Sequence, residues 1–157
     1  MLILARESIL TILLVTTVFY DLRYRIVPNY LIVLSIAAGL IVTGMEGIAA
    51  LLKTMTLAVL LSYPLYYGYE RGWMGGGDVK LVLATSLIAG EKLAKVYFLV
   101  GALGGGMVSL WYLLANRIKQ HRSQGAYEGK QAVMVPYAAA YAACGLLAQL
   151  VLWVSRK

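Results

Sequence analysis

The stretch GWMGGGDVKL, from Gly72 to Leu81, joins three consecutive glycines to an aspartate inside a chain that is otherwise mostly apolar. The apolar run after Asp78 predicts a helix that begins there, and the glycines before it predict backbone that another chain can approach closely. A carboxylate at the start of such a helix needs water, a partner or a function, because a charge in apolar surroundings is costly. Which of these applies to Asp78 depends on the rest of the sequence.

The composition indicates a membrane protein. Of the 157 residues, 61% are hydrophobic and only 13% are charged, and the mean hydropathy is +0.77. A soluble domain of this size needs a charged surface that this chain cannot supply, so a single integral-membrane domain over residues 1–157 is predicted. The net charge of +7 comes from basic residues between apolar runs. Such residues contact lipid headgroups, and no nucleic-acid partner is predicted.

Six apolar segments predict an all-α, polytopic fold with about six transmembrane helices. The segments are 2–20, 30–43, 48–67, 78–89, 96–115 and 133–154. The second and fourth are shorter than the ~20 residues that cross a typical bilayer, so a count of about four or five spans stays open. Asn29, after Pro28, is predicted to cap the second helix. Residues 116–131, the longest polar stretch, are predicted to form a surface loop that contains the single histidine, His121.

The chain has only two aspartates, and the predicted topology brings both to one face of the membrane. Asp21 ends the first apolar segment and Asp78 begins the fourth, with two membrane crossings between them. This conclusion does not depend on the total number of spans. The 14 Lys and Arg residues are slightly more frequent in the odd-numbered loops, next to which the aspartates lie. This face is therefore predicted to be cytoplasmic, with both termini outside.

Two carboxyl groups at one membrane face suit peptide hydrolysis. Within a few ångströms of each other they cannot easily both ionise, so one keeps its proton while the other acts as a base. The ionised aspartate takes a proton from an attacking water, and the protonated aspartate donates to the developing oxyanion. This chemistry requires no metal, no cofactor and no nucleophilic side chain. Gly75, Gly76 and Gly77 are predicted to bind the substrate, because an extended peptide can lie against backbone without side chains.

Other chemistries lack the residues that they need. His121 lies in a polar stretch, so no Ser–His or Cys–His pair is predicted, and no HExxH motif is present. Cys144 is the only cysteine, which excludes an intrachain disulfide and a CxxC metal site. Two other classes of function stay open. Asp21 and Asp78 could bind a cation or relay protons in a small transporter or channel, or they could be interfacial anchors in a structural membrane subunit.

The residues around both aspartates resemble the motifs of the type IV prepilin peptidases, which are GxGD aspartyl membrane proteases. The sequence GGGD at 75–78, followed by a hydrophobic helix, matches the GxGD signature. The sequence DLRYRIVPN, from Asp21 to Asn29, matches the first aspartate motif of the family, and VPY at 135–137 resembles the start of its last helix. The resemblance covers essentially the whole chain.

This resemblance implies that the protein removes the short basic leader from a type IV prepilin or pseudopilin. Cleavage would follow a glycine at the cytoplasmic face of the inner membrane, with Asp21 and Asp78 as the catalytic pair. Larger family members also methylate the new N-terminus through an N-terminal region that often holds CxxC motifs. Here one apolar segment precedes Asp21 and Cys144 is the only cysteine, so neither methyltransferase activity nor zinc is predicted. The short form is similar to the peptidases of tight-adherence (Flp) pilus systems, with archaeal preflagellin peptidases as the second candidate.

Overall fold

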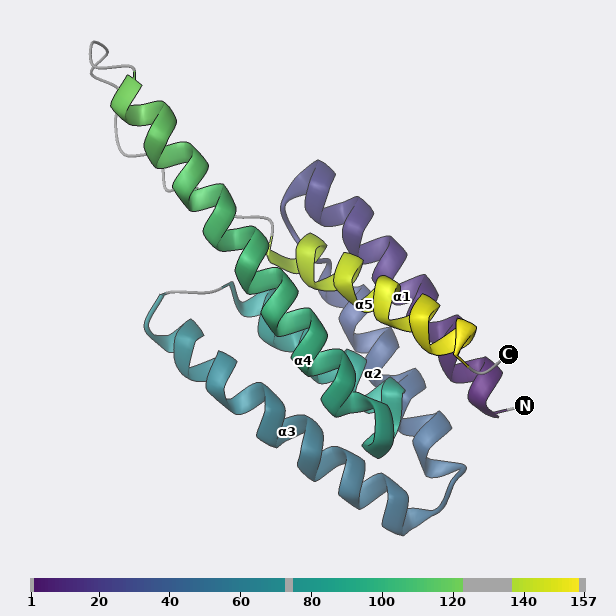
Figure 1. The fold of residues 1–157 in the computed structure, drawn as a ribbon. Helices are drawn as coiled ribbons and strands as arrows, with labels where there is room; N and C mark the ends of the chain where they lie inside the picture. Colours follow the sequence, from purple (N-terminus) through teal and green to yellow (C-terminus); the bar gives the residue numbers. More distant parts are fainter. Residues whose placement is uncertain (1, 73–74, 123–136, 156–157) are drawn as a thin grey trace.

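The computed structural model describes residues 2–72, 75–122 and 137–155, and this part of the chain consists of helices and short connections (Figure 1). The helices are α1 (Leu2–Tyr24), α2 (Asn29–Gly44), α3 (Ile48–Glu70), α4 (Gly76–Arg122) and α5 (Tyr137–Val154). The all-α prediction is confirmed. By length and composition, α1, α3 and α5 are able to cross a membrane.

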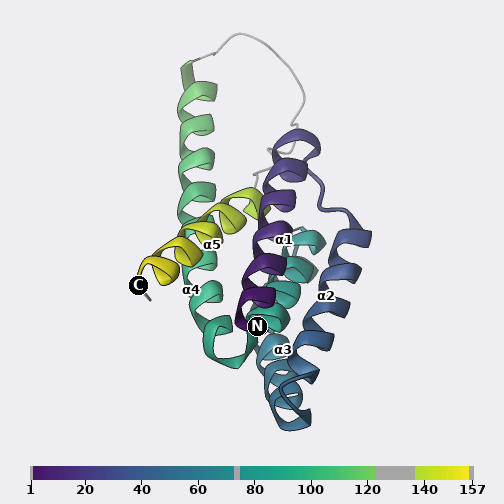
Figure 2. The ribbon, with the colours of Figure 1, turned by 90° about the vertical axis from the view of Figure 1, so that its right-hand side faces the viewer.

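The helix α4 contains a break at the position where the sequence predicts the end of the fourth segment. Gly90 has φ 76° and ψ 173°, a backbone conformation that is far from helical and that glycine adopts without a steric penalty. The chain reverses direction there (Figures 1 and 2). The first part of α4, 76–89, and the second part, 91–122, therefore correspond to the fourth and fifth apolar segments.

The prediction of about six transmembrane helices is not confirmed. Three of the five described helices meet the length and hydropathy that a span requires, and α2 is a shorter apolar helix. At 1.5 Å per residue, α2 is ~24 Å long and the first part of α4 is ~21 Å long. Both are shorter than the ~30 Å hydrocarbon core of a typical bilayer. The described helices therefore support an all-α membrane protein but not six spans.

The predicted start of the loop at residue 116 is wrong, because α4 stays helical as far as Arg122. Polar residues continue a helix readily when it leaves the bundle, as the second part of α4 does in Figure 1. Residues 123–131 lie outside the described part of the chain, as does the predicted start of the sixth segment at 133. The described helix α5 begins at Tyr137.

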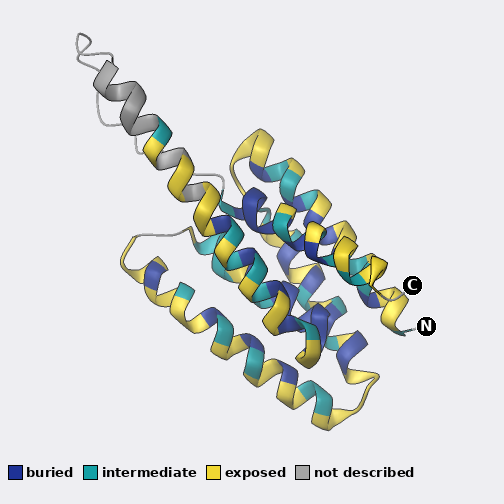
Figure 3. Cartoon of the chain, in the orientation of Figure 1, coloured by how far each residue is buried: buried dark blue, intermediate teal, exposed yellow. Residues whose placement is uncertain are grey.

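Apolar side chains form both the core and much of the outer surface. The core contains Leu10, Leu13 and Leu14 of α1, packed with buried residues of the first part of α4 and of α5. Exposed apolar residues continue along α3, which Figure 3 shows as mostly exposed on its outer side. An apolar exterior of this extent indicates a surface that contacts lipid.

Glycines allow the second part of α4 to pack closely against α5. A Cβ atom at Gly101 would lie 2.3 Å from the ring of Tyr141, and one at Gly104 would lie 2.2 Å from the sulfur of Cys144. The hydroxyl of Tyr141 also forms a 2.9 Å hydrogen bond with Thr85 in the first part of α4. These contacts hold α5 against both parts of α4, so the start of α5 comes near the start of α4.

Candidate active site

Asp78 lies in the first turn of α4 and is held by Gly75, the residue just before the helix. The backbone N–H of Gly75 donates to Oδ2 of Asp78 at 3.2 Å, and the N–H of Asp78 donates to the carbonyl of Gly75 at 3.1 Å. A carboxylate in this place satisfies one of the unpaired N–H groups at the helix start and is favoured by the helix dipole. The helix α4 thus fixes the Asp78 side chain at its own N-terminus.

Asp21 lies in the last turns of α1 and is buried, with 6% of its surface exposed. Its Oδ2 accepts a 2.6 Å hydrogen bond from the N–H of Ala139, in the first turn of α5. The N-terminus of a helix is a favourable site for a carboxylate, because N–H groups without helical partners point outward there. Asp21 is therefore held by a helix that lies 118 residues away in the sequence.

The structure brings the two aspartates to one end of the bundle. The charge of Asp21 acts on Asp78, and that of Asp78 acts on the hydroxyl of Tyr137 at the start of α5. The guanidinium of Arg25, which follows α1, acts on Asp21 with the opposite sign. The ends of α1, α4 and α5 therefore form one electrostatically coupled site.

The three glycines before Asp78 have different surroundings. A Cβ atom at Gly75 would lie 3.3 Å from Oδ2 of Asp78, and one at Gly76 would lie 3.1 Å from the ring of Tyr69. A Cβ atom at Gly77 would meet Val27 at 3.5 Å, which is an ordinary van der Waals distance. Of the three glycines, Gly77 is therefore the one at which an added Cβ atom would disturb the fold least. The role of the three residues in substrate binding stays a prediction.

Asn29 has a different role from the predicted cap. The N-cap of α2 is Pro28, and no side-chain bond caps the helix. Oδ1 of Asn29 instead accepts a 3.0 Å hydrogen bond from Nζ of Lys80. This bond ties the start of α2 to the first turns of α4, next to Asp78.

Sequence reasoning missed the parts of the site that come from backbone or from distant contacts. The N–H of Ala139 carries no sequence signal, because every residue except proline has one. The bond between Asn29 and Lys80 joins residues whose types are common at membrane boundaries. Tyr137 belongs to the VPY sequence that was singled out, but its nearness to Asp78 depends on the packing of α5. Val135 and Pro136 lie outside the described residues.

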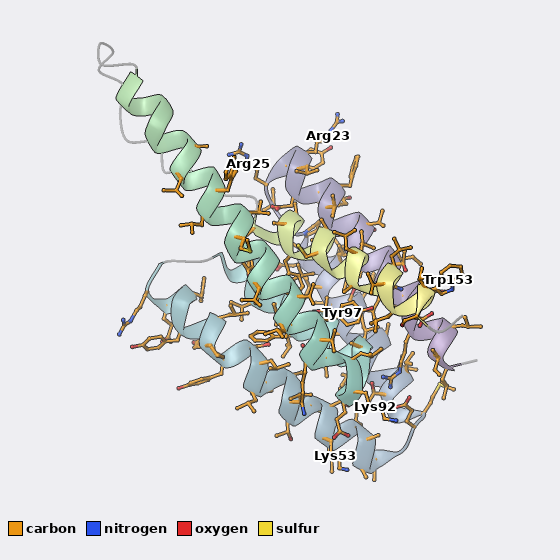
Figure 4. All side chains as sticks on the ribbon, in the orientation of Figure 1. Arg23, Arg25, Lys53, Lys92, Tyr97 and Trp153 are labelled. Atoms are coloured by element: carbon orange, nitrogen blue, oxygen red, sulfur yellow. The ribbon has the colours of Figure 1, made fainter. Side chains whose placement is uncertain are left out.

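Basic residues mark both ends of the bundle. Figure 4 shows Arg23 and Arg25 near the end of α1 that carries Asp21, and Lys53 and Lys92 toward the opposite end. Basic residues at the two ends of an apolar bundle match the two headgroup regions of a bilayer. Within the described residues, no group of three or more His, Cys, Asp or Glu side chains could hold a metal ion.

Comparison with known protein families matches residues 8–114 to the type IV leader peptidase family. The match covers more than half of the chain and includes both aspartates and the three glycines. The chain belongs to the type IV leader peptidase family. The protein is therefore a hydrolase of the leader-peptidase class, and its apolar helices make it an integral membrane protein. Neither curated proteins nor solved structures give a match.

The helix α5 lies beyond the matched range of this peptidase. It nevertheless supplies the N–H group that holds Asp21 and the tyrosine that is coupled to Asp78. The described site thus depends on a part of the chain that the family match does not include.

Proposed function

We propose that this peptidase is an intramembrane aspartyl endopeptidase that removes the short basic leader from type IV prepilins or pseudopilins. Cleavage follows a glycine at the cytoplasmic face of the membrane, and Asp21 and Asp78 are the catalytic residues. One observation supports this most strongly: the only two aspartates of the chain are held at one end of the helix bundle, by backbone N–H groups at the starts of α4 and α5. Both lie in the region that matches the family.

In the proposed mechanism the two carboxyl groups share one proton. The ionised aspartate removes a proton from a water molecule, whose oxygen forms a bond to the carbonyl carbon of the scissile peptide. The protonated aspartate donates its proton to the carbonyl oxygen, so a neutral gem-diol forms. The aspartate that took the proton from water then gives it to the amine nitrogen as the carbon–nitrogen bond breaks. One gem-diol hydroxyl loses its proton to the other aspartate, so the pair again holds one proton. The N–H groups of Gly75 and Ala139 orient the carboxyl groups throughout.

The substrate enters this site as an extended backbone beside the three glycines. Gly75 is exposed, and Gly77 has no neighbour closer than an ordinary contact. A leader peptide that runs past these residues brings its scissile carbonyl toward Asp78, because no side chain separates the two backbones. The hydrophobic segment of the prepilin then continues into the bilayer alongside the peptidase.

The proposed site faces the cytoplasm, where the basic leader of a prepilin lies. The substrate in this proposal is an Flp-like prepilin or a pseudopilin. In this proposal the helix α2 and both parts of α4 lie within the bilayer together with α1, α3 and α5. Because α2 and the first part of α4 are short, the bilayer thins around them, at a modest cost per ångström of mismatch.

The experiment that tests the function replaces each aspartate with asparagine, as Asp21→Asn and Asp78→Asn. Each variant is expected to lose at least ~10²-fold in the rate of prepilin cleavage, because an amide can neither take nor give the catalytic proton. The rate is measured with purified peptidase in detergent and a synthetic peptide that contains a leader, its glycine and a following apolar segment.

The matched control is Glu91→Gln, because it makes the same chemical change at an exposed residue beside the break at Gly90. This variant is expected to cleave at the wild-type rate. If either asparagine variant cleaves as fast as the wild type, the two-aspartate mechanism is wrong. Ion flux through liposomes that both asparagine variants abolish, without any prepilin cleavage by the wild type, would indicate a transporter.

A further inference from the structure

A second buried polar cluster lies at the opposite end of α1 from Asp21. Arg6 is only 9% exposed, and its Nη1 donates to the carbonyl of Ala89 at 3.1 Å. Its Nη2 donates to Oγ1 of Thr43 at 3.3 Å and pairs with the carboxylate of Glu46 at 2.8 Å. Thr43 in turn donates to the carbonyl of Leu87 at 3.0 Å. We refer to Arg6, Thr43 and Glu46 together as the Arg6 clamp.

The Arg6 clamp satisfies the backbone that the break at Gly90 leaves without helical partners. The first part of α4 ends at Ala89, and the last carbonyls of a helix lack intrahelical donors. The clamp supplies donors to two of them, those of Leu87 and Ala89. The positive guanidinium is also favoured at a helix C-terminus.

Gly90 is the residue that makes room for this contact. A Cβ atom at Gly90 would lie 1.8 Å from Nη1 of Arg6. The guanidinium therefore occupies the space that any other side chain at position 90 would need. The break and the clamp form one structural unit.

The clamp and the proposed catalytic pair lie at opposite ends of the same two helices. At 1.5 Å per residue, about 22 Å of α1 separates Arg6 from Asp21, and about 16 Å of α4 separates Ala89 from Asp78. A bond between Arg6 and Ala89 thus sets how far α1 and the first part of α4 are shifted along each other. A slip by one residue would move Asp78 by about 1.5 Å relative to Asp21.

We propose that Arg6 is a positioning residue for the hydrolysis. By holding the end of the first part of α4 against α1, it sets the place of Asp78 relative to Asp21. The inference rests on the proposed function only in taking these two aspartates as catalytic. The place of the helix itself can be measured without any substrate.

A pair of cysteines reports the place of the first part of α4. A Cβ atom at Gly77 would lie 3.5 Å from Cβ of Val27, which is within the range of a disulfide. The reporter chain carries Val27→Cys, Gly77→Cys and Cys144→Ala, so that the two new thiols can pair only with each other. Under mild oxidation in detergent, the two thiols are expected to pair rapidly. Gel-shift labelling of the remaining thiols with a polymer-linked maleimide gives the rate.

The decisive variant is Arg6→Met, which keeps an unbranched apolar stem and removes the guanidinium donors. In the reporter chain it is expected to slow disulfide formation several-fold. In the otherwise wild-type peptidase it is expected to lower kcat for the leader peptide by roughly 10²-fold with little change in KM, because the reacting groups are misplaced by an ångström or more. Disulfide formation at the parental rate in a folded Arg6→Met chain overturns the proposal. Loss of cleavage without slower disulfide formation overturns it too.

The matched control is Glu46→Gln, which leaves the bonds to the carbonyl groups in place. The Glu46 side chain is 39% exposed, so water can replace much of its ion pair. Disulfide formation and cleavage are expected to stay at the parental rate. If Glu46→Gln had an effect as large as that of Arg6→Met, the ion pair and not the bonds to the carbonyl groups would position the helix.

A second variant keeps the test decisive where Arg6→Met fails to fold. Thr43→Val retains the shape of the residue and removes its bonds to Arg6 and to the carbonyl of Leu87. Thr43→Val is expected to slow disulfide formation less than Arg6→Met does. Disulfide formation at the parental rate would contradict the proposed role of the Arg6 clamp. If the wild-type peptidase cleaves no leader peptide, the proposed function fails, but the disulfide rates still decide whether Arg6 positions the helix.

Discussion

The two ends of α1 hold buried polar groups of opposite charge in otherwise apolar surroundings. At one end, Asp21 accepts a hydrogen bond from the N–H of Ala139 at the start of α5. At the other end, Arg6 donates to the carbonyl of Ala89 at the end of the first part of α4. The carboxylate meets a helix N-terminus and the guanidinium meets a helix C-terminus, as the helix dipole favours in each case.

The two ends differ in the charged groups that surround them. Arg6 pairs with the opposite charge of Glu46, and its bond to the carbonyl of Ala89 holds α1 to the end of the first part of α4. At the other end, the charge of Asp21 acts on its fellow carboxylate Asp78, and the guanidinium of Arg25 acts on Asp21 with the opposite sign. Like charges brought together in one site are typical of acid–base catalysis. The comparison separates an end that stabilises the fold from an end that we propose carries the chemistry.

The largest effect on stability is expected at the Arg6 end, from Gly90→Ala. Alanine is strained at φ 76° and ψ 173°, and its Cβ would displace Nη1 of Arg6. A loss of about 3 kcal/mol in the free energy of unfolding is expected. The measurement is unfolding in mixed micelles, followed by circular dichroism.

The control for this prediction is Gly44→Ala, at the end of α2. A Cβ atom there meets nothing within 4 Å. Its effect is expected to be below ~1 kcal/mol. Equal stability of the two alanine variants would show that the break does not need glycine and would remove the contrast between the ends.

The next effect concerns catalysis at the aspartate end, from Gly77→Ala. The fold tolerates this change, because the new Cβ meets Val27 at 3.5 Å. If a substrate backbone lies against Gly77, the methyl group displaces it and cleavage falls by roughly 10- to 100-fold. Leader-peptide cleavage and the unfolding midpoint are measured on the same preparation.

Gly106→Ala serves as the control, since its Cβ would also meet nothing within 4 Å. It is expected to change neither cleavage nor stability. Full activity of Gly77→Ala would argue against a substrate at this glycine and leave Gly75 and Gly76 as the remaining candidates.

The smallest effect is the pH dependence of cleavage. Activity rises with pH while the base of the pair loses its proton, and it falls at higher pH when the acid also loses its proton. A bell-shaped profile of kcat/KM is therefore expected, with limbs that change by about tenfold per pH unit. Unfolding midpoints at the same pH values separate catalysis from stability. A flat profile over the range in which the peptidase stays folded would rule out a shared proton.

Local patterns in the sequence predicted the helices and the residues of the site, but not its contacts. Asp21 and Asp78 were found because carboxylates are rare in apolar segments, and the end of the fourth segment was found because Gly90 follows an apolar run. The predicted cap at Asn29 was wrong, since its side chain binds Lys80 from another helix. The beginning of the polar loop was wrong because the helical backbone of α4 extends past the last apolar residue to Arg122.

The sequence by itself determined that this protein is a helical membrane protein with two aspartates at the ends of apolar segments, and its motifs indicated a peptidase. These properties follow from composition and from motifs of a few residues. Only the tertiary structure decided that Ala139 holds Asp21 and that Arg6 holds Ala89. The physical reason is that one partner in each bond is a backbone group. Every residue has a carbonyl group and nearly every residue has an N–H, so only the packing of the helices selects the ones that are used.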